Sequence, residues 1–321
     1  MKIVILDGYT SNPGDLSWDG IKAFGDVTVY DRTDNKNPAE AIQRIGSAEA
    51  VLTNKTILSR EIIDAAPNLR YIGVLATGFN VVDIAAANEH GITVTNIPCY
   101  GTEATAQHAF ALLLEASNRV GEYNALVHEG KWQTAKDFTF QLDSPLIELS
   151  GKTLGIFGFG RIGKAVGRIA RAFGMNVLAT NRSESDEGRA IARYVPIDEL
   201  LSQSDFISLN AALTPELVGF INKERIAKMK NGVILINASR GPILNEQDVA
   251  DALNSGKIRC AAVDVVSIEP ILPDNPLLHA KNCIITPHVA WTPLDTRRRL
   301  LEIAADNLAK FIAGSPINTV N

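Results

Sequence analysis

Residues 158–163 read Gly158-Phe159-Gly160-Arg161-Ile162-Gly163, and this stretch decides the fold. It follows an apolar run, 153–157, that predicts a buried strand, and it opens a segment, 162–173, with helical periodicity. A Gly-x-Gly-x-x-Gly turn between a strand and a helix is typical of dinucleotide binding. The first glycine permits a tight turn, the second lets the backbone approach a pyrophosphate, and the third lets helix and strand pack closely. The N-terminus of the helix offers amides and a partial positive charge to the phosphates.

The end of the next predicted strand, 176–180, indicates which dinucleotide binds. In NAD enzymes an acidic residue at this point bonds the ribose hydroxyls. Here the strand is followed by Asn181, Arg182 and Ser183, so the acid is missing. An arginine at this place can accept the 2′-phosphate of NADP. We therefore expect NAD or NADP, with a preference for NADP, while the alternative that Arg182 is only a solvated surface residue stays open.

Around this turn, short apolar runs alternate with longer amphipathic segments, which predicts parallel sheets covered by helices. The pattern occurs twice, so we expect an α/β protein with two Rossmann-like, doubly wound domains and a cleft between them. A long helix over 103–126 is expected to link the two series. The predicted strands are 3–6, 27–30, 50–53, 71–75 and 92–95, then 153–157, 176–180, 206–209, 233–237, 260–265 and 283–286.

Composition agrees with a globular enzyme and excludes several other classes. At about 150 residues per domain, 321 residues predict two domains. The hydrophobic fraction of 46% is too high for a disordered chain, and no apolar run approaches the length of a membrane span. With 36 acidic and 31 basic residues the net charge is −5, which argues against a nucleic-acid partner. Three scattered cysteines and no signal-peptide pattern predict a reduced, cytoplasmic protein without a metal site.

Three chemically active residues follow predicted strands of the second series. Arg240 follows 233–237, Glu269 follows 260–265, and His288 follows 283–286. Ligands of open α/β sheets bind beyond the carboxyl ends of the strands, so all three should lie near the cofactor. An arginine fork grips a carboxylate, a histidine moves a proton near neutral pH, and a carboxylate beside it favours the imidazolium. His108 lies in the long helix, where we expect it only to pack.

The glycine turn and the segments 237–241, 264–270 and 287–291 together resemble the D-isomer-specific 2-hydroxyacid dehydrogenases over nearly the whole chain. Other segments are similar to the glycerate dehydrogenases, also called hydroxypyruvate reductases, within that family. They are Thr53-Asn54-Lys55, Leu75-Ala76-Thr77-Gly78-Phe79-Asn80, Tyr100-Gly101-Thr102 and 145–151.

This resemblance implies roles for individual residues. Arg240 would bind the carboxylate and carbonyl oxygen of the substrate, His288 would be the acid–base group, and Glu269 would pair with it. Asn54, Thr77 and Gly78 are also implied to bind substrate. Besides residues 158–163 and 181–183, the implied cofactor contacts are Thr105, Ala211, Thr214, Asn237, Ala238, Ser239, Asp264 and Ala290.

The resemblance also implies a discontinuous substrate-binding domain, 1–99 plus 292–321, and a dinucleotide-binding domain, 100–291, through which the protein forms a homodimer. The implied reaction moves a hydride between the dinucleotide and a small 2-oxo or 2-hydroxy acid. Hydroxypyruvate and glyoxylate, with D-glycerate and glycolate as products, are the expected substrates. Two alternatives stay open: a D-2-hydroxyacid dehydrogenase for a larger keto acid, and a nucleotide-sensing, corepressor-like protein of the same fold.

Overall fold

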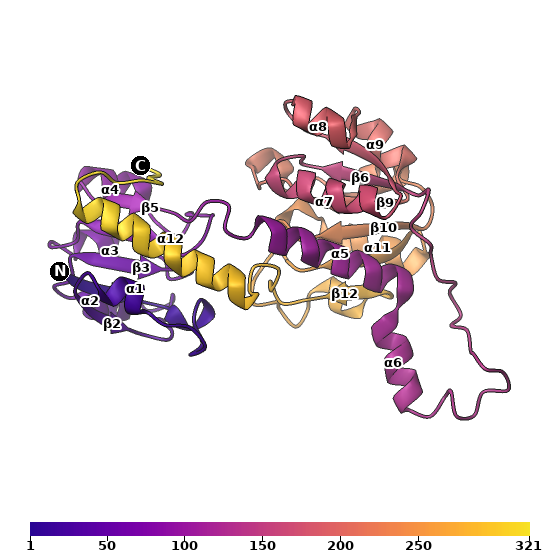
Figure 1. The fold of residues 1–321 in the computed structure, drawn as a ribbon, viewed down its shortest axis with the longest axis horizontal. Coiled ribbons are helices and arrows are strands. Elements are labelled where there is room, and N and C mark those ends of the chain that lie inside the picture. The colour runs from indigo at the N-terminus through magenta and orange to yellow at the C-terminus, as the bar shows by residue number, and fades with distance from the viewer. The chain divides into compact units, whose positions relative to one another are not determined.

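The computed structural model describes residues 1–321, which divide into two compact units. Unit 1 consists of Met1–Gly101 and Thr292–Asn321, and unit 2 of Thr102–Trp291. Each unit is built on its own parallel sheet, as the labelled ribbon shows (Figure 1). The predicted α/β class with two parallel sheets is therefore confirmed. None of the helices combines the length and the apolar character that a membrane crossing requires.

Unit 1 contains a five-stranded parallel sheet in the order β2-β1-β3-β4-β5, the order of flavodoxin-like folds. Its strands are short and mostly buried, as expected where helices cover both faces. The strands are β1 (Lys2–Ile5), β2 (Asp26–Val29), β3 (Ala50–Thr53), β4 (Tyr71–Val74) and β5 (Thr93–Thr95). The helices are α1 (Asp19–Lys22), α2 (Pro38–Ile45), α3 (Arg60–Asp64), α4 (Ile84–Glu89) and α12 (Leu294–Ile312).

Unit 2 contains a seven-stranded parallel sheet in the order β12-β11-β10-β9-β6-β7-β8. Counted from the glycine turn, this is the strand order of dinucleotide-binding folds, in which the order reverses beside β6. The strands are β6 (Thr153–Phe157), β7 (Asn176–Thr180), β8 (Arg193–Tyr194), β9 (Phe206–Leu209), β10 (Val233–Asn237), β11 (Ile258–Val263) and β12 (Cys283–Ile285). The helices are α5 (Thr102–Asn118), α6 (Val120–His128), α7 (Arg161–Ala172), α8 (Asp186–Ile191), α9 (Ile197–Gln203), α10 (Lys223–Lys228) and α11 (Glu246–Ser255).

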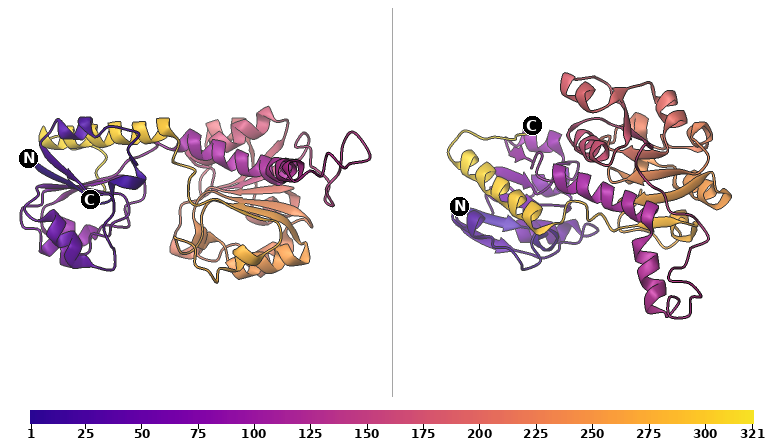
Figure 2. Two further views of the ribbon diagram at one scale, coloured as in Figure 1. Left: turned by 90° about the horizontal axis from the view of Figure 1, so that it is seen from below. Right: turned by 45° about the vertical axis from the view of Figure 1, so that its right-hand side comes forward.

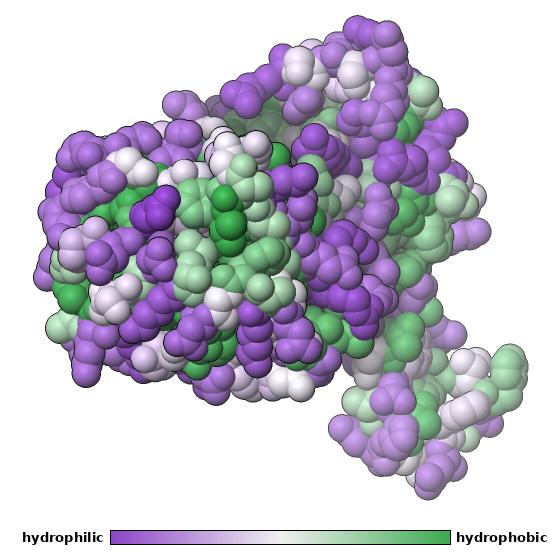
Figure 3. Space-filling view, turned by 60° about the vertical axis from the view of Figure 1, so that its left-hand side comes forward, coloured by the Kyte–Doolittle hydropathy of each residue, from purple (hydrophilic) through white to green (hydrophobic).

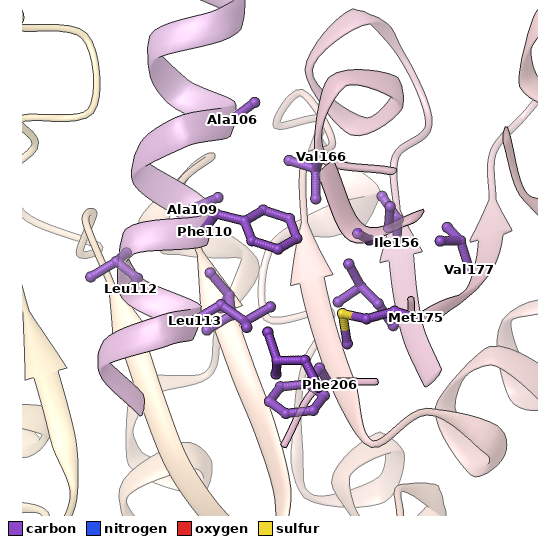
Figure 4. Close-up of a cluster of buried hydrophobic side chains, with 14 of the residues drawn as sticks. Ala106, Ala109, Phe110, Leu112, Leu113, Ile156, Val166, Met175, Val177 and Phe206 are labelled. Atoms are coloured by element: carbon purple, nitrogen blue, oxygen red, sulfur yellow. The ribbon is translucent and has the colours of Figure 1, made fainter. Parts of the chain in front are cut away.

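Apolar packing on both faces fixes the sheet of unit 2. In Figure 2, left, α5 and α11 lie on opposite sides of it. On the α5 side, Ala109, Phe110 and Leu113 point into a cluster with Ile156 and Phe206 (Figure 4). Burying one such aliphatic or aromatic side chain contributes about 1.5–3 kcal/mol, so this face alone holds α5 against the strands.

The predicted long helix over 103–126 is wrong in one respect, because the chain breaks into α5 and α6 at Arg119. The backbone of Arg119 is left-handed, with φ of 50°. The carboxylate of Glu115 accepts from the amide of Gly121 at 3.2 Å and so satisfies a free donor in the first turn of α6. The sequence analysis also did not predict β8, α8 and α9, which are short and lack a clear hydrophobic period.

Candidate active site

The glycine turn forms a cradle with room for a pyrophosphate. Gly158 has φ of +87°, and a Cβ there would lie 2.4 Å from the amide nitrogen of Ala211. A Cβ on Gly163 would lie 2.3 Å from the carbonyl oxygen of Gly158, so helix and turn approach too closely for any other residue. A Cβ on Gly160, by contrast, would meet nothing within 4 Å. This open space lies at the N-terminus of α7, where unpaired amides attract phosphate, so the residues present fit a dinucleotide.

Asn181 braces this turn. Its side-chain oxygen accepts from the amide of Phe159 at 3.3 Å, and its Nδ2 donates to the carbonyl of Ser183 at 2.9 Å. The neighbouring Arg182 is exposed. The pKa of Glu216 lies below its ordinary value, mainly because Thr214 donates a hydrogen bond to it, and the positive charge of Arg182 adds to the effect. The positive charge of Arg182 therefore reaches Glu216 at this edge of the cradle.

The end of β10 positions Arg240. Asn237 is fully buried; its Nδ2 donates to the carbonyl of Arg240 at 3.0 Å, while its Oδ1 accepts from the amide of Ser239 at 3.1 Å. Arg240 is exposed, and Nη1 of its guanidinium donates to the carbonyl of Ser239 at 2.7 Å. A Cβ on Gly241 would lie 1.9 Å from the carbonyl carbon of Val266, so the loops after β10 and β11 touch at this glycine. Arg240 therefore leaves the sheet beside the loop that carries Glu269.

His288 and Glu269 form a direct pair. Nδ1 of His288 lies 2.6 Å from Oε2 of Glu269, and the other carboxylate oxygen accepts from the amide of Val266 at 3.3 Å. A carboxylate only accepts, so the proton lies on Nδ1 and the ring directs Nε2 away from the pair. The side chain of His288 is 28% exposed, which keeps it accessible to a ligand. The backbone of His288 is left-handed, with φ of 55°.

Asp264 holds the turn that carries His288. Its carboxylate accepts from the amides of Val289 and Ala290, both at 2.9 Å, and from the hydroxyl of Thr286 at 2.6 Å. Its carbonyl oxygen accepts from the amide of His288 at 2.7 Å. Burial alone raises the pKa of Asp264, but hydrogen bonds from His108, Thr286 and the two amides outweigh burial, so its pKa is lowered. Asp264 therefore stays ionised beneath the turn.

Sequence reasoning missed the position of His108. Its Nε2 lies 3.0 Å from Oγ1 of Thr286 and 3.3 Å from Oδ1 of Asp264, so it joins this network instead of only packing. One signal could have found it. His108 follows Thr105 by three residues, and side chains at that spacing share one face of a helix.

The substrate residues implied for unit 1 lie at the carboxyl ends of β3 and β4. Nδ2 of Asn54 donates to Oγ of Ser11 at 3.2 Å and to the carbonyl of Leu75 at 3.0 Å, so this amide is used within the unit. The hydroxyl of Thr77 donates to the carbonyl of Ile97 at 2.8 Å. The backbone amides of Thr77 and Gly78 have no acceptor within unit 1. Two consecutive unpaired amides suit an anion.

The other cofactor residues implied by the sequence all lie in unit 2. Thr105 is buried on α5, and Arg161 and Ile162 begin α7. The remaining ones follow strands: Ala211 and Thr214 after β9, Ala238 and Ser239 after β10, and Ala290 after β12.

A Rossmann sheet with a glycine cradle, an exposed arginine and a histidine–carboxylate pair at its carboxyl edge defines the class of nicotinamide-dependent oxidoreductases. Residues 110–290 match the family model described as D-isomer specific 2-hydroxyacid dehydrogenase, NAD binding domain. The chain belongs to this family and is an NAD(P)-dependent D-2-hydroxyacid dehydrogenase.

Comparisons with individual proteins agree. The chain is 57% identical, over the whole length of both chains, to a hydroxypyruvate reductase of Blautia hydrogenotrophica. It is 41% identical to a glyoxylate reductase of Korarchaeum cryptofilum, with 87% of this chain and 85% of the relative covered. The TT0316 protein of Thermus thermophilus superposes with a TM-score of 0.88 at 34% identity, and both chains are covered completely. The family resemblance that the sequence indicated is thus confirmed.

Proposed function

We propose that this protein reduces hydroxypyruvate to D-glycerate, and glyoxylate to glycolate, with a nicotinamide dinucleotide as the hydride donor. The observation that carries the substrate assignment is the full-length 57% identity to a hydroxypyruvate reductase. The similarity to a glyoxylate reductase supports the second, smaller substrate. The free thiols of the buried Cys260 and half-buried Cys283 suit the proposed cytoplasmic location, where thiols stay reduced.

In this proposal the keto acid is held by its carboxylate. The exposed guanidinium of Arg240 offers a planar fork of donors, which matches a carboxylate and also reaches a neighbouring carbonyl oxygen. The free amides of Thr77 and Gly78 are the carboxylate donors of unit 1. Asn54 acts indirectly, because its bond to the carbonyl of Leu75 fixes the segment that leads to these amides.

His288 supplies the proton. The dinucleotide, when bound in the glycine cradle, provides the hydride for the keto carbon. His288 donates the proton at Nε2 to the keto oxygen, while Glu269 holds Nδ1 and stabilises the imidazolium before transfer. Arg240 stabilises the negative charge that develops on the oxygen. In the oxidation direction the same nitrogen of His288 accepts the proton.

We also propose that NADPH is accepted in preference to NADH. The three residues directly after β7 are Asn181, Arg182 and Ser183, so the position of the usual ribose-binding carboxylate carries no negative charge that would repel a 2′-phosphate. The amide of Asn181 is used within the turn, which leaves the exposed Arg182 as the neighbouring donor. Glu216 opposes this preference, because the negative charge of its carboxylate offsets part of the positive charge of Arg182.

The protein is proposed to form a homodimer through unit 2. Helix α6 has no buried residue, and together with the loop over 129–143 it projects from the unit (Figure 1). This segment, which we call the arm, exposes 54% of Trp132 and 90% of Phe138. Hydrophobic residues are visible on the projecting part in Figure 3. Aromatic side chains this exposed are typical of an interface, and a second copy of the chain is the proposed partner.

A substrate panel tests this function. Initial rates are measured at the absorbance of the reduced nicotinamide with hydroxypyruvate, glyoxylate, pyruvate and a branched 2-oxo acid, each with NADH and NADPH. The proposal predicts the highest kcat/KM for hydroxypyruvate, followed by glyoxylate. A highest value for the branched acid would assign a larger keto acid as substrate instead. Dinucleotide binding without turnover of any of these acids would favour a nucleotide-sensing protein.

A further inference from the structure

Helix α5 contributes one polar side chain to the turn over 286–290. Nε2 of His108 lies 3.0 Å from Oγ1 of Thr286, which in turn lies 2.6 Å from Oδ1 of Asp264. The carboxylate of Asp264 can only accept, so the single hydroxyl proton of Thr286 points toward it. The hydrogen on Nε2 of His108 then points to Oγ1 of Thr286 as the nearer acceptor, with Oδ1 of Asp264 a second acceptor at 3.3 Å. The chain of donors therefore runs from His108 through Thr286 to Asp264.

The far end of this chain reaches the backbone of His288. The carboxylate of Asp264 accepts hydrogen bonds from the amides of Val289 and Ala290, and its carbonyl oxygen accepts one from the amide of His288. His288 is left-handed, a conformation that a residue with a side chain holds only when its surroundings impose it. The contacts of Asp264 impose it here. If Asp264 moved, these amides would lose their acceptor, and the backbone that orients the imidazole of His288 could change conformation.

We propose that His108 is a positioning residue for the reaction: by donating to Thr286 it fixes Asp264, the turn over 286–290 and thus the direction of His288. This inference rests on the proposed role of His288 as the proton donor. His108 does not touch the reacting atoms in this scheme. Its effect falls on turnover, because a small displacement of a catalytic group slows the chemical step more than it weakens binding.

The side chains around His108 favour this role over packing. Its own side chain is 21% exposed, whereas the carboxylate of Asp264 is completely buried. An apolar residue at position 108 would remove one donor from Thr286 and a polar neighbour from Asp264. A buried carboxylate that loses such partners must find water or move.

The test compares two substitutions at one position. His108→Ala should lower kcat about 10- to 100-fold, while KM for hydroxypyruvate and the Kd of the dinucleotide change little. His108→Gln places an amide Nε2 near the position of the imidazole Nε2, so it should restore kcat to within about threefold of wild type. His108 exchanges no proton with the substrate in this proposal, so the pH profile of His108→Gln should match that of wild type. His279→Ala, at an exposed histidine of the same unit, is the matched control and should leave kcat unchanged.

A double-mutant cycle separates the proposed chain of donors from general destabilisation. Thr286→Val removes the hydroxyl between His108 and Asp264 together with its own hydrogen bond to Asp264, so it should lower kcat at least as much as His108→Ala. The double variant should be no slower than Thr286→Val alone. Additive losses, a folded His108→Ala with wild-type kcat, or a glutamine variant as slow as alanine would each overturn the inference. His288→Ala is measured alongside: if it retains turnover, the proposed function fails, whereas loss of turnover there with a normal His108→Ala rejects only the role of His108.

Discussion

Nδ1 of His288 lies 2.6 Å from Oε2 of Glu269, although nineteen residues separate them in the sequence. The two residues follow β12 and β11, which are neighbours in the parallel sheet. Parallel neighbours end at the same edge, so their loops emerge side by side. The short contact therefore follows from the topology of the sheet, and it gives the imidazole one defined orientation.

Removing the charge of Glu269 should shift the pH dependence of reduction. Glu269→Gln keeps the shape of the side chain but removes the anion that favours protonated His288. Because reduction needs the protonated ring, the alkaline limb of kcat/KM should move toward acid. Rates measured from pH 5 to 9 with hydroxypyruvate give the profile.

Asp274→Asn serves as the control for this shift, since Asp274 is an exposed carboxylate of the same loop. Its profile should superimpose on that of wild type. A Glu269→Gln profile that also superimposes would show that the pair does not set the protonation of the ring.

The proposed preference for NADPH over NADH depends on Arg182. A charge-assisted contact with the 2′-phosphate contributes about 1.5–3 kcal/mol, and solvent exposure brings it toward the low end. Arg182→Ala should therefore lower kcat/KM for NADPH about tenfold and leave that for NADH nearly unchanged. The ratio of the two efficiencies is the measurement, with Arg189→Ala on the exposed face of α8 as control. A wild type that strongly prefers NADH, or an equal loss with both dinucleotides, would make Arg182 a surface residue only.

Glu216 provides a complementary substitution. Its carboxylate lies in the field of Arg182, so Glu216→Gln should leave more of that positive charge for a 2′-phosphate. The predicted result is a lower KM for NADPH, by about two- to fivefold, with little change for NADH. A rise in the KM for NADPH would show instead that Glu216 supports the binding of NADPH.

The ionised carboxylate of Asp264 should contribute to stability in a pH-dependent way. Its folded pKa is below the ordinary value of 3.8, so its contribution is present above that value and is lost as pH falls through the folded pKa. Asp264→Asn should cost about 1.5–3 kcal/mol at pH 7, since charged hydrogen bonds are removed. The difference in the free energy of unfolding between wild type and Asp264→Asn should stay constant down to about pH 5 and narrow near pH 4 and below. Urea unfolding at several pH values measures it, and a gap that widens toward acid contradicts the assignment.

The arm can be tested through its most exposed aromatic side chain. Phe138→Ser should shift sedimentation-equilibrium mass from about twice the chain mass toward one chain mass at micromolar concentration, because a central aromatic anchor contributes about 2 kcal/mol or more to an interface. Ile312→Ser changes an exposed apolar residue outside the arm and should leave the mass unchanged. A wild-type protein that sediments as a monomer would refute the proposed dimer.

Features that are determined by residues close together in the sequence were predictable. The glycine turn is one, because Gly158 and Gly163 meet steric demands that no other residue satisfies. The N-cap of α11 is another, because asparagine is a common N-cap residue, and the side chain of Asn245 accepts from the amide of Asp248 at 3.1 Å. The edge that Arg240, Glu269 and His288 share was also predictable, because each follows a strand of one parallel sheet.

Features that depend on contacts between distant elements were not predictable. The break at Arg119 rests on a carboxylate that reaches across the junction of two helices, while the apolar period continues through it. Strand β8 has only two residues, too few for any pattern. The contact of His108 arises only when α5 packs against the sheet. Its spacing from Thr105 indicates the helix face on which it lies, but not the partners that it meets there.

His288 carries the proton in the proposed reduction of hydroxypyruvate, and removing its imidazole is the sharpest test of that role. Steady-state reduction is followed with wild type and His288→Ala, while dinucleotide binding is measured by quenching of protein fluorescence. We expect kcat to fall at least about 100-fold, the usual size of acid–base catalysis, and the Kd of the dinucleotide to change less than about threefold. A folded His288→Ala variant that turns over hydroxypyruvate at the wild-type rate would contradict it.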